Sequence, residues 1–283
     1  MNRRSSWNLL ALLAPGYLWL LLFGFAPLGI MLYFSFLSDT PLGARTVEFT
    51  FDNYLRYFSR GFYSQLTGRS SLMGFYTTVG CLILGYPLAY ALAKRVQGRW
   101  QTVLFLLVIV PFWSNSLIRL YSWIIVLGRN GVVNQTLGWL GWSTDASILF
   151  TYPAIIIGLV HAYLPYMVLT IYVALDRLDD RLIEAAMSLG ARPWRVFWRV
   201  VLPLSMPGVL AGVILVFIPA IGSFVEPRLL GGPAGTMLGT VIEDQFVQVF
   251  NWPLGAALSF ILLAIVIVIM AAAARLLTQR SPI

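Results

Sequence analysis

Six long apolar stretches dominate this chain of 283 residues, and each is long enough to cross a lipid bilayer as a helix. A bilayer core of about 30 Å needs about 20 residues of helix, because lipid offers an exposed backbone no other hydrogen-bonding partner. The predicted spans cover residues 9–36, 71–93, 102–127, 150–175, 205–230 and 253–277. We therefore predict an all-α polytopic membrane protein with about six transmembrane helices.

The composition agrees with a membrane protein and argues against a nucleic-acid-binding one. Charged residues make up 11% of the chain, whereas soluble proteins carry roughly a quarter. The net charge is +8, but the 19 Lys and Arg residues are spread between the apolar runs, which is typical of a topology signal. The first run exceeds the about 7 to 15 residues of a signal-peptide core, so we interpret it as a retained anchor. No polar linker divides the chain, which predicts a single transmembrane domain over residues 1–283.

The basic residues predict the orientation of the spans in the membrane. If the N-terminus is cytoplasmic, 12 of the 19 Lys and Arg residues lie inside, including those of the short turn from Lys94 to Arg99. Cytoplasmic loops carry the excess of Lys and Arg in membrane proteins. We therefore predict a multi-pass protein of the bacterial inner membrane with both termini in the cytoplasm.

The polar residues within the apolar runs argue against two classes of function, a membrane enzyme and an ion-coupled secondary transporter. A membrane enzyme needs a cluster of catalytic groups, but Cys81 is the only cysteine and His161 the only histidine. We expect Cys81 to be a packing residue and His161 to be a core or pore-lining residue. An ion-coupled secondary transporter needs protonatable or sodium-binding groups near the midplane. The second, fourth and sixth predicted spans have no carboxylate in their central portions, so such a transporter is the less favoured alternative.

The internal segment of residues 176–204 is the most highly charged part of the chain, with nine of its 30 charged residues. Asp179 or Asp180 can cap a short helix there, and Gly190 suits its end because glycine tolerates the left-handed conformation of a sharp stop. Pro193 favours the first turn of a second helix, which is amphipathic. We predict that this second helix lies on the membrane surface rather than crossing it.

The spacing within this segment resembles a known motif. Glu184-Ala185-Ala186, three residues, Gly190, nine residues and Val200-Val201-Leu202-Pro203 are similar to the EAA loop of the binding-protein-dependent ABC importer permeases of type I fold. Val200 replaces the isoleucine that is usual in that family. The resemblance implies a coupling helix that binds a groove of a cytoplasmic ATPase dimer. It further implies a second permease subunit and an external or periplasmic solute-binding protein as partners. The candidate coupling residues are Glu184, Ala185, Ala186, Gly190, Arg192, Leu202 and Pro203.

The residue types of the motif suit a docking surface. Ala185 and Ala186 let another backbone approach closely, and Glu184 offers a charge that can fix the register against a partner. Glu184 can instead pair with Arg181, three residues earlier on the same helix. Both pairings stay open from the sequence alone.

The chain itself lacks the means to hydrolyse ATP. A phosphate-binding loop needs Gly-x4-Gly-Lys followed by Ser or Thr. Lys94 is the only lysine, and it lies between Ala93 and Arg95. We therefore predict a transport subunit that is not an enzyme and holds no cofactor, with ATP and Mg²⁺ bound by the separate ATPase.

A second group of motifs resembles one branch of this family, the spermidine/putrescine permeases. The matching residues are Pro111-Phe112-Trp113, Val216-Phe217-Ile218-Pro219-Ala220, Phe224-Val225, Leu229-Leu230-Gly231-Gly232-Pro233 and Met237-Leu238-Gly239. In that branch an acidic residue commonly occupies the position of Ser223 and a non-acidic one that of Glu226, so the carboxylate here is displaced by three residues. The resemblance implies a polyamine substrate and two non-identical permease halves. Permeases for opines or amino-acid derivatives share much of the pattern and are the alternative.

A polyamine in a dry passage needs carboxylates and aromatic faces to replace the water around its ammonium groups. The candidates for such a path are Trp113, Tyr121, Phe224 and Glu226. The aromatic residues can instead belong to an interfacial belt, and Glu226 can instead pair with Arg228 or Arg119. For Arg119 we expect a carbonyl, a lipid headgroup or the acidic rim of the external binding protein as partner.

Overall fold

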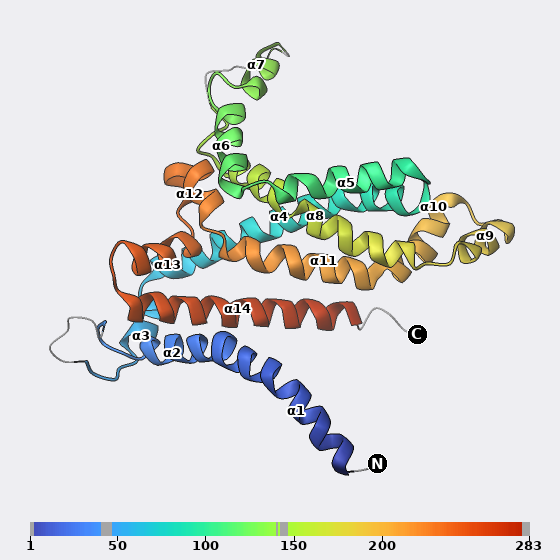
Figure 1. Cartoon of the computed structure of the whole chain (residues 1–283). Helices are drawn as coiled ribbons and strands as arrows, with labels where there is room; N and C mark the ends of the chain where they lie inside the picture. Colours follow the sequence, from blue (N-terminus) through green and yellow to red (C-terminus); the bar gives the residue numbers. More distant parts are fainter. Residues whose placement is uncertain (1–2, 41–46, 140, 142–146, 279–283) are drawn as a thin grey trace. The chain divides into compact units, whose positions relative to one another are not determined.

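The apolar runs form long helices, as expected for segments that must satisfy their backbone hydrogen bonds within one element. The computed structural model describes residues 3–40, 47–139, 141 and 147–278, and within them the one β contact is an isolated bridge between Leu37 and Phe49. The elements are α1 (Arg3–Leu20), the π-helical turn η1 (Leu21–Phe25), α2 (Ala26–Ser35), α3 (Asp52–Ser59), α4 (Gly61–Lys94), α5 (Arg99–Trp113), α6 (Ser116–Leu127), α7 (Val132–Trp139), α8 (Tyr152–Asp176), α9 (Asp180–Ser188), α10 (Pro193–Val196), the π-helical turn η2 (Phe197–Val201), α11 (Leu202–Gly222), α12 (Val225–Gly231), the 3-10 turn η3 (Gly232–Gly235), α13 (Leu238–Val247) and α14 (Trp252–Thr278) (Figure 1).

The long helices confirm the predicted all-α polytopic membrane fold. Within the described residues, five helices are long and apolar enough to cross a membrane, and a bent pair makes up to six. The chain divides into two compact units, one of Met1–Gln65 with Val241–Ile283 and one of Leu66–Thr240. In the first unit, α2 and α3 both pack against α14. The second unit contains the predicted coupling segment and all four candidates for the substrate path.

The pair α8 and α11 forms the centre of the second unit, and glycines allow these helices to pack closely. A Cβ atom added at Gly208 would lie 2.4 Å from the Cβ of Ala174 and 2.6 Å from the Thr170 carbonyl oxygen. Four residues later, a Cβ atom at Gly212 would lie 2.6 Å from the Met167 sulfur. Small residues at this spacing let two helix backbones approach in a membrane, where packing replaces the hydrophobic effect.

The third predicted span is not one straight helix, which corrects the prediction for residues 102–127. Its two parts, Arg99–Trp113 and Ser116–Trp139, are bent by 96°. Asn115 caps the second part, because its side-chain oxygen accepts a hydrogen bond of 2.8 Å from the Leu117 N–H. Across the break, Arg119 Nη1 donates to the Pro111 carbonyl oxygen at 3.0 Å, so the expected carbonyl partner of Arg119 is confirmed.

The fifth span also differs from the prediction at both ends. The helix is continuous over Pro193–Gly222, so the predicted amphipathic helix is joined to the span without a break rather than forming a separate helix. The turn η2 makes this possible: the Leu202 N–H donates to the Phe197 carbonyl, five residues back, and this wider turn accommodates Pro203. At the other end, the helix stops at Gly222 rather than residue 230, and α12 follows as a separate helix.

Candidate coupling loop and substrate path

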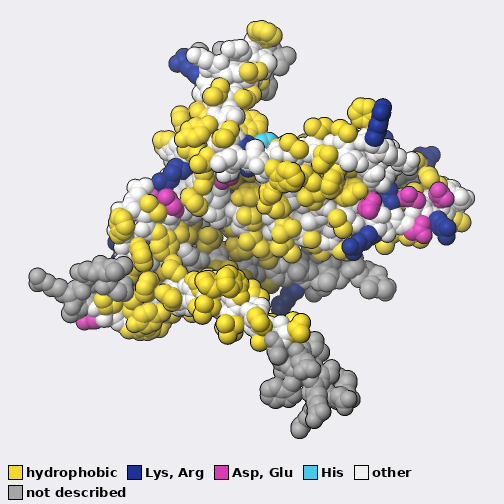
Figure 2. All heavy atoms as spheres, in the orientation of Figure 1, with side chains coloured by type: hydrophobic (Ala, Val, Ile, Leu, Met, Phe, Trp, Pro, Cys, Tyr) yellow, Lys and Arg dark blue, Asp and Glu magenta, His cyan; other side chains and the backbone are white. Residues whose placement is uncertain are grey.

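The predicted helix and sharp turn of the internal segment are present. Asp179 caps α9, and its Oδ1 accepts a hydrogen bond of 3.0 Å from the Arg181 N–H. The helix ends at Ser188, and Gly190 has a φ of +82°, in the left-handed region that favours glycine. Charged side chains gather around α9 at this end of the second unit, whereas the flanks of α5, α8 and α11 are mostly hydrophobic (Figure 2).

Most of the candidate coupling residues are exposed near the tip of the loop. Glu184, Ala185, Gly190 and Arg192 are exposed, and Ala186 is half-buried. Beside them lies a recess of about 290 Å³ that is lined by Ala186, Leu189, Gly190, Ala191, Arg195, Val196, Arg199 and Val200. By contrast, Leu202 packs against the core and Pro203 lies on the first turn of α11. The structure thus brings the residues of α9 and its turn together and leaves the Leu-Pro pair on the span.

Lys94 holds the loop from a distant part of the chain, and sequence reasoning missed this role. Its Nζ donates to the Leu178 carbonyl oxygen at 2.7 Å and to Asp180 Oδ1 at 2.6 Å, and its side chain is 7% exposed. The last residue of α4 is thereby tied to the first residue of α9. The available signal was the presence of a single lysine in a chain that otherwise uses arginine.

We predict that Lys94→Met makes local opening of α9 more frequent. Methionine keeps much of the length of the side chain but leaves the Leu178 carbonyl without its charged donor, a bond worth about 1.5–3 kcal/mol. The lost pair with the largely exposed Asp180 carboxylate adds less, about 0–1 kcal/mol, because solvent screens it. Hydrogen exchange of the amides of α9 should quicken about tenfold or more, while the amides of α8 stay protected. Arg95→Met, on the neighbouring residue, is the control. Unchanged exchange in α9 would show that Lys94 does not hold the loop.

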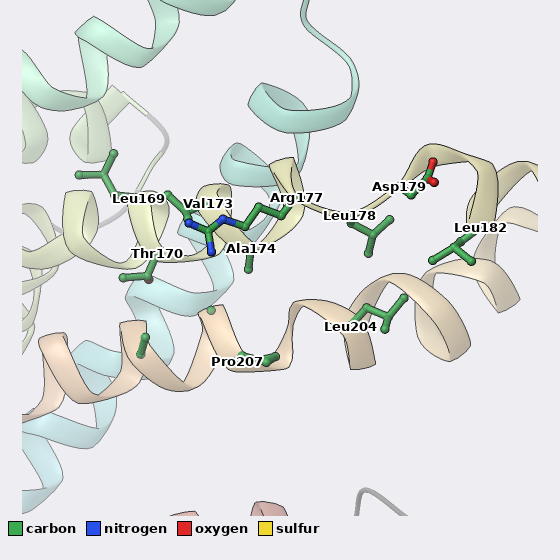
Figure 3. A pocket seen from close by; sticks show the side chains of 12 residues that line it. Leu169, Thr170, Val173, Ala174, Arg177, Leu178, Asp179, Leu182, Leu204 and Pro207 are labelled. Atoms are coloured by element: carbon green, nitrogen blue, oxygen red, sulfur yellow. The ribbon is translucent and has the colours of Figure 1, made fainter. Parts of the chain in front are cut away.

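A larger groove lies behind the loop, between α8 and α11 (Figure 3). Its volume is about 780 Å³, and its walls are mostly apolar. The lining residues are Leu169, Thr170, Val173, Ala174, Arg177, Leu178, Asp179, Leu182, Leu204, Pro207, Gly208 and Ala211. Arg177 folds back along α8 toward Val173, and Asp179 lies at the end of the groove formed by the loop (Figure 3). Residues 177–179, at the base of the loop, therefore line a groove.

At the opposite end of α11, Glu226 lies in a small polar cluster. The Ser223 hydroxyl donates a hydrogen bond to Glu226 Oε2, and the hydroxyl of Tyr163 on α8 lies near both residues. Ser223 is buried, whereas Glu226 is half-buried. Sequence reasoning weighed arginines as partners of Glu226 and missed the serine three residues earlier, which is within reach of one helical turn.

Close backbone contacts hold the segment that carries Glu226. A Cβ atom at Gly235 would lie 1.9 Å from the Pro227 carbonyl oxygen, and one at Gly239 would lie 2.6 Å from the Ser223 carbonyl oxygen. Gly239 is one of the residues that resemble the polyamine branch, and Gly235 lies between two of the matching groups. Their contacts explain why glycine is needed there: a side chain at either position would displace the backbone beside the carboxylate.

The remaining candidates for the path lie on other elements. Phe224 is exposed and precedes α12, next to Glu226. Trp113 is 81% exposed at the end of α5, and the exposed Tyr121 lies on α6, so these two residues occupy the two arms of the bent span. Nearby, the indole N–H of Trp123 donates to His161 Nδ1 at 3.2 Å. His161 is thus a packing partner, and no group of three or more potential metal ligands occurs in the described part of the chain.

Comparisons with known proteins agree with this geometry. The family model of the binding-protein-dependent transport system inner membrane component matches residues 82–281. The chain is 42% identical over 266 residues to the spermidine/putrescine transport system permease protein PotB of Salmonella typhimurium, covering 93% of this chain and 92% of that protein. It is 41% identical to PotB of Escherichia coli, covering 93% and 96%.

A solved structure with the same fold is that of a bacterial alginate ABC transporter in complex with an alginate pentasaccharide-bound periplasmic protein. The TM-score is 0.73 at 19% sequence identity, and the match covers 95% of this chain and 93% of that chain. Because the family model spans well over half of the sequence and the two relatives are more than 40% identical over nearly all of it, the family is established. This chain belongs to the family of binding-protein-dependent transport system inner membrane components.

Proposed function

We propose that the chain is the transmembrane permease subunit of an ATP-driven importer for a small organic cation, a polyamine such as spermidine or putrescine. The observation that carries this proposal is the identity of 41–42%, over 93% of the chain, to two permeases whose names give that substrate. Glu226 supports it. In the described parts of residues 66–240, the other carboxylates are Asp176, Asp179, Asp180 and Glu184 at the loop end, so Glu226 is the one acidic group at the opposite end.

The partners follow from the proposed function. An ABC ATPase dimer, which binds ATP and Mg²⁺, docks on the coupling loop through Glu184, Ala185, Ala186, Gly190 and Arg192, with Leu202 and Pro203 at the base. An external or periplasmic solute-binding protein delivers the substrate; the similar alginate transporter was solved with such a protein. A second, non-identical permease completes the passage. The loop and both termini then face the cytoplasm of a bacterium, and alternating access moves the substrate inward.

The substrate path in this proposal passes the outer end of α11. Glu226 provides the negative charge that a desolvated ammonium group needs, and Phe224 provides an adjacent aromatic face. Trp113 and Tyr121 contribute from the bent third span. A transported amino-acid derivative or opine is the second candidate, and the exposed Arg228 on α12 favours it, because such a solute carries a carboxylate as well as an ammonium group.

The test is substrate-dependent ATP hydrolysis by the complete importer in proteoliposomes. The complex of both permeases and the ATPase is supplied with its binding protein and one solute from a panel of spermidine, putrescine, an opine and an uncharged sugar. We expect a polyamine to raise ATP hydrolysis several-fold above the rate with the unloaded binding protein. Stimulation by the opine and not by either polyamine would replace the polyamine proposal with the second candidate.

A further inference from the structure

We propose that Ser223 and Tyr163 are positioning residues that hold the Glu226 carboxylate in place for an ammonium group of the substrate. This inference rests on the proposed function and adds to it two residues that do not touch the cation themselves. Ser223 lies in the link between α11 and α12, and Tyr163 lies on α8, so the cluster joins three elements around one carboxylate.

The hydrogen bond from Ser223 leaves most of the carboxylate available. An ionised carboxylate has about four acceptor positions on its two oxygens, and the serine hydroxyl occupies one position on Oε2. Because Ser223 is buried at 7% exposure, water does not compete easily for this bond. Oε1 and the outer side of Oε2 are then presented in a fixed orientation, as a carboxylate must be if it is to replace the water around an ammonium group.

The backbone beneath the cluster is closely packed, which limits how far it can shift to compensate for a lost contact. The Ser223 carbonyl lies against Gly239, the Pro227 carbonyl lies against Gly235, and the Leu230 side chain fills the space above Gly158 on α8. On a flexible loop, movement of the backbone could bring a carboxylate to the cation without any positioning residue. On this closely packed segment, rotation about the side-chain bonds is the remaining freedom of Glu226, and the Ser223 hydroxyl restricts that rotation, with Tyr163 beside it.

The rival explanation is purely structural: the serine and glutamate stabilise the turn between α11 and α12 and have no part in transport. The two explanations differ in one respect. If Ser223 acts through the Glu226 charge, removing the Ser223 hydroxyl has no effect on transport once the charge is gone. If Ser223 instead makes a structural contact between α11, α12 and α8 that does not depend on the charge, removing its hydroxyl lowers transport in both backgrounds.

The experiment is therefore a double-mutant cycle in the reconstituted importer, with spermidine-stimulated ATP hydrolysis and uptake as readouts. Ser223→Ala and Tyr163→Phe each remove one hydroxyl group, Glu226→Gln removes the charge, and Ser223→Ala is then repeated in the Glu226→Gln background. We expect Ser223→Ala to lower stimulated activity about tenfold, as the loss of one hydrogen bond to a charged group predicts. Ser223→Thr, which keeps a hydroxyl group, should restore most of it. In the Glu226→Gln background, Ser223→Ala should cause no further loss.

The outcomes separate this inference from the proposed function. If spermidine and putrescine fail to stimulate the wild-type importer, the proposed function is wrong and the inference falls with it. If they stimulate the wild type, but Ser223→Ala and Tyr163→Phe both behave like it, the positioning role is wrong and the function stands. An equal loss from Ser223→Ala with and without Glu226 would assign the serine to the structure of the turn. If Ser223→Ala does not assemble, Tyr163→Phe in the same cycle decides the question.

Discussion

Replacing Ala186 with tryptophan is expected to reduce polyamine uptake to the level of an importer without its ATPase, while the membrane helices stay folded. Ala186 lines the recess of about 290 Å³ beside the coupling loop, and an indole ring would fill that recess. An ATPase groove that docks closely against small residues cannot move away from one of them without losing its contacts with the others. One large side chain therefore prevents docking on this surface. Uptake and stimulated ATP hydrolysis should both fall by more than tenfold.

Two further variants show whether the effect belongs to the docking surface. Ala185→Trp adds the same ring at the exposed neighbouring position and should cause a similar loss. Ala272→Trp adds it at an exposed position on α14, far along the chain from the loop, and should leave transport intact. Co-purification with the ATPase checks the cause directly. Normal uptake by the Ala186→Trp variant would rule out a coupling role for this face of α9.

The second large effect is expected at the contact between α8 and α11. Gly208→Ala places a methyl group 2.4 Å from the Ala174 Cβ and 2.6 Å from the Thr170 carbonyl oxygen, and these backbones must separate to admit it. Overpacking of this kind costs about 1–3 kcal/mol. We expect a lower thermal midpoint for the purified permease complex and less assembled complex in the membrane.

Gly222→Ala is the matched control, because it makes the same change on the same helix where no atom lies within 4 Å of the added methyl group. Alanine favours a helix over glycine, so this variant should be at least as stable as the wild type. If both variants melt alike, the close approach at Gly208 does not limit stability, and the pairing of α8 with α11 depends on other contacts.

Features set by local chemistry could be predicted from the sequence. Apolar length alone located the long helices, although the third predicted span is bent and the fifth begins and ends at other residues. The capping role of Asp179 and the left-handed turn at Gly190 followed from the residue types, because each needs little more than its own neighbours in the chain. The resemblance of the Glu184 segment to a known loop gave the family, which the comparisons established.

Other features depend on contacts or backbone details that hydropathy does not record. The bend in the third span arises where Asn115 starts a new helix and Arg119 bonds across the break, and the average hydropathy of the run does not record either contact. The fifth span continues through Pro203 because a π turn precedes it. Lys94 was missed because its partners, Leu178 and Asp180, lie more than 80 residues away in the sequence.

The unbroken helix from Pro193 to Gly222 has a mechanical consequence for transport. Its 30 residues span about 45 Å, with the turn at Gly190 just before one end and the Ser223 hydroxyl just after the other. This helix links the two ends without a gap, and the points at which it can bend are the π turn η2 and the interior prolines Pro207 and Pro219. A displacement of the loop is passed to the carboxylate to the extent that these points stay stiff. Reciprocity adds a converse to the proposed function: if a bound cation and the loop are coupled through this helix, the cation changes the affinity of the loop for the proposed ATPase by the same factor.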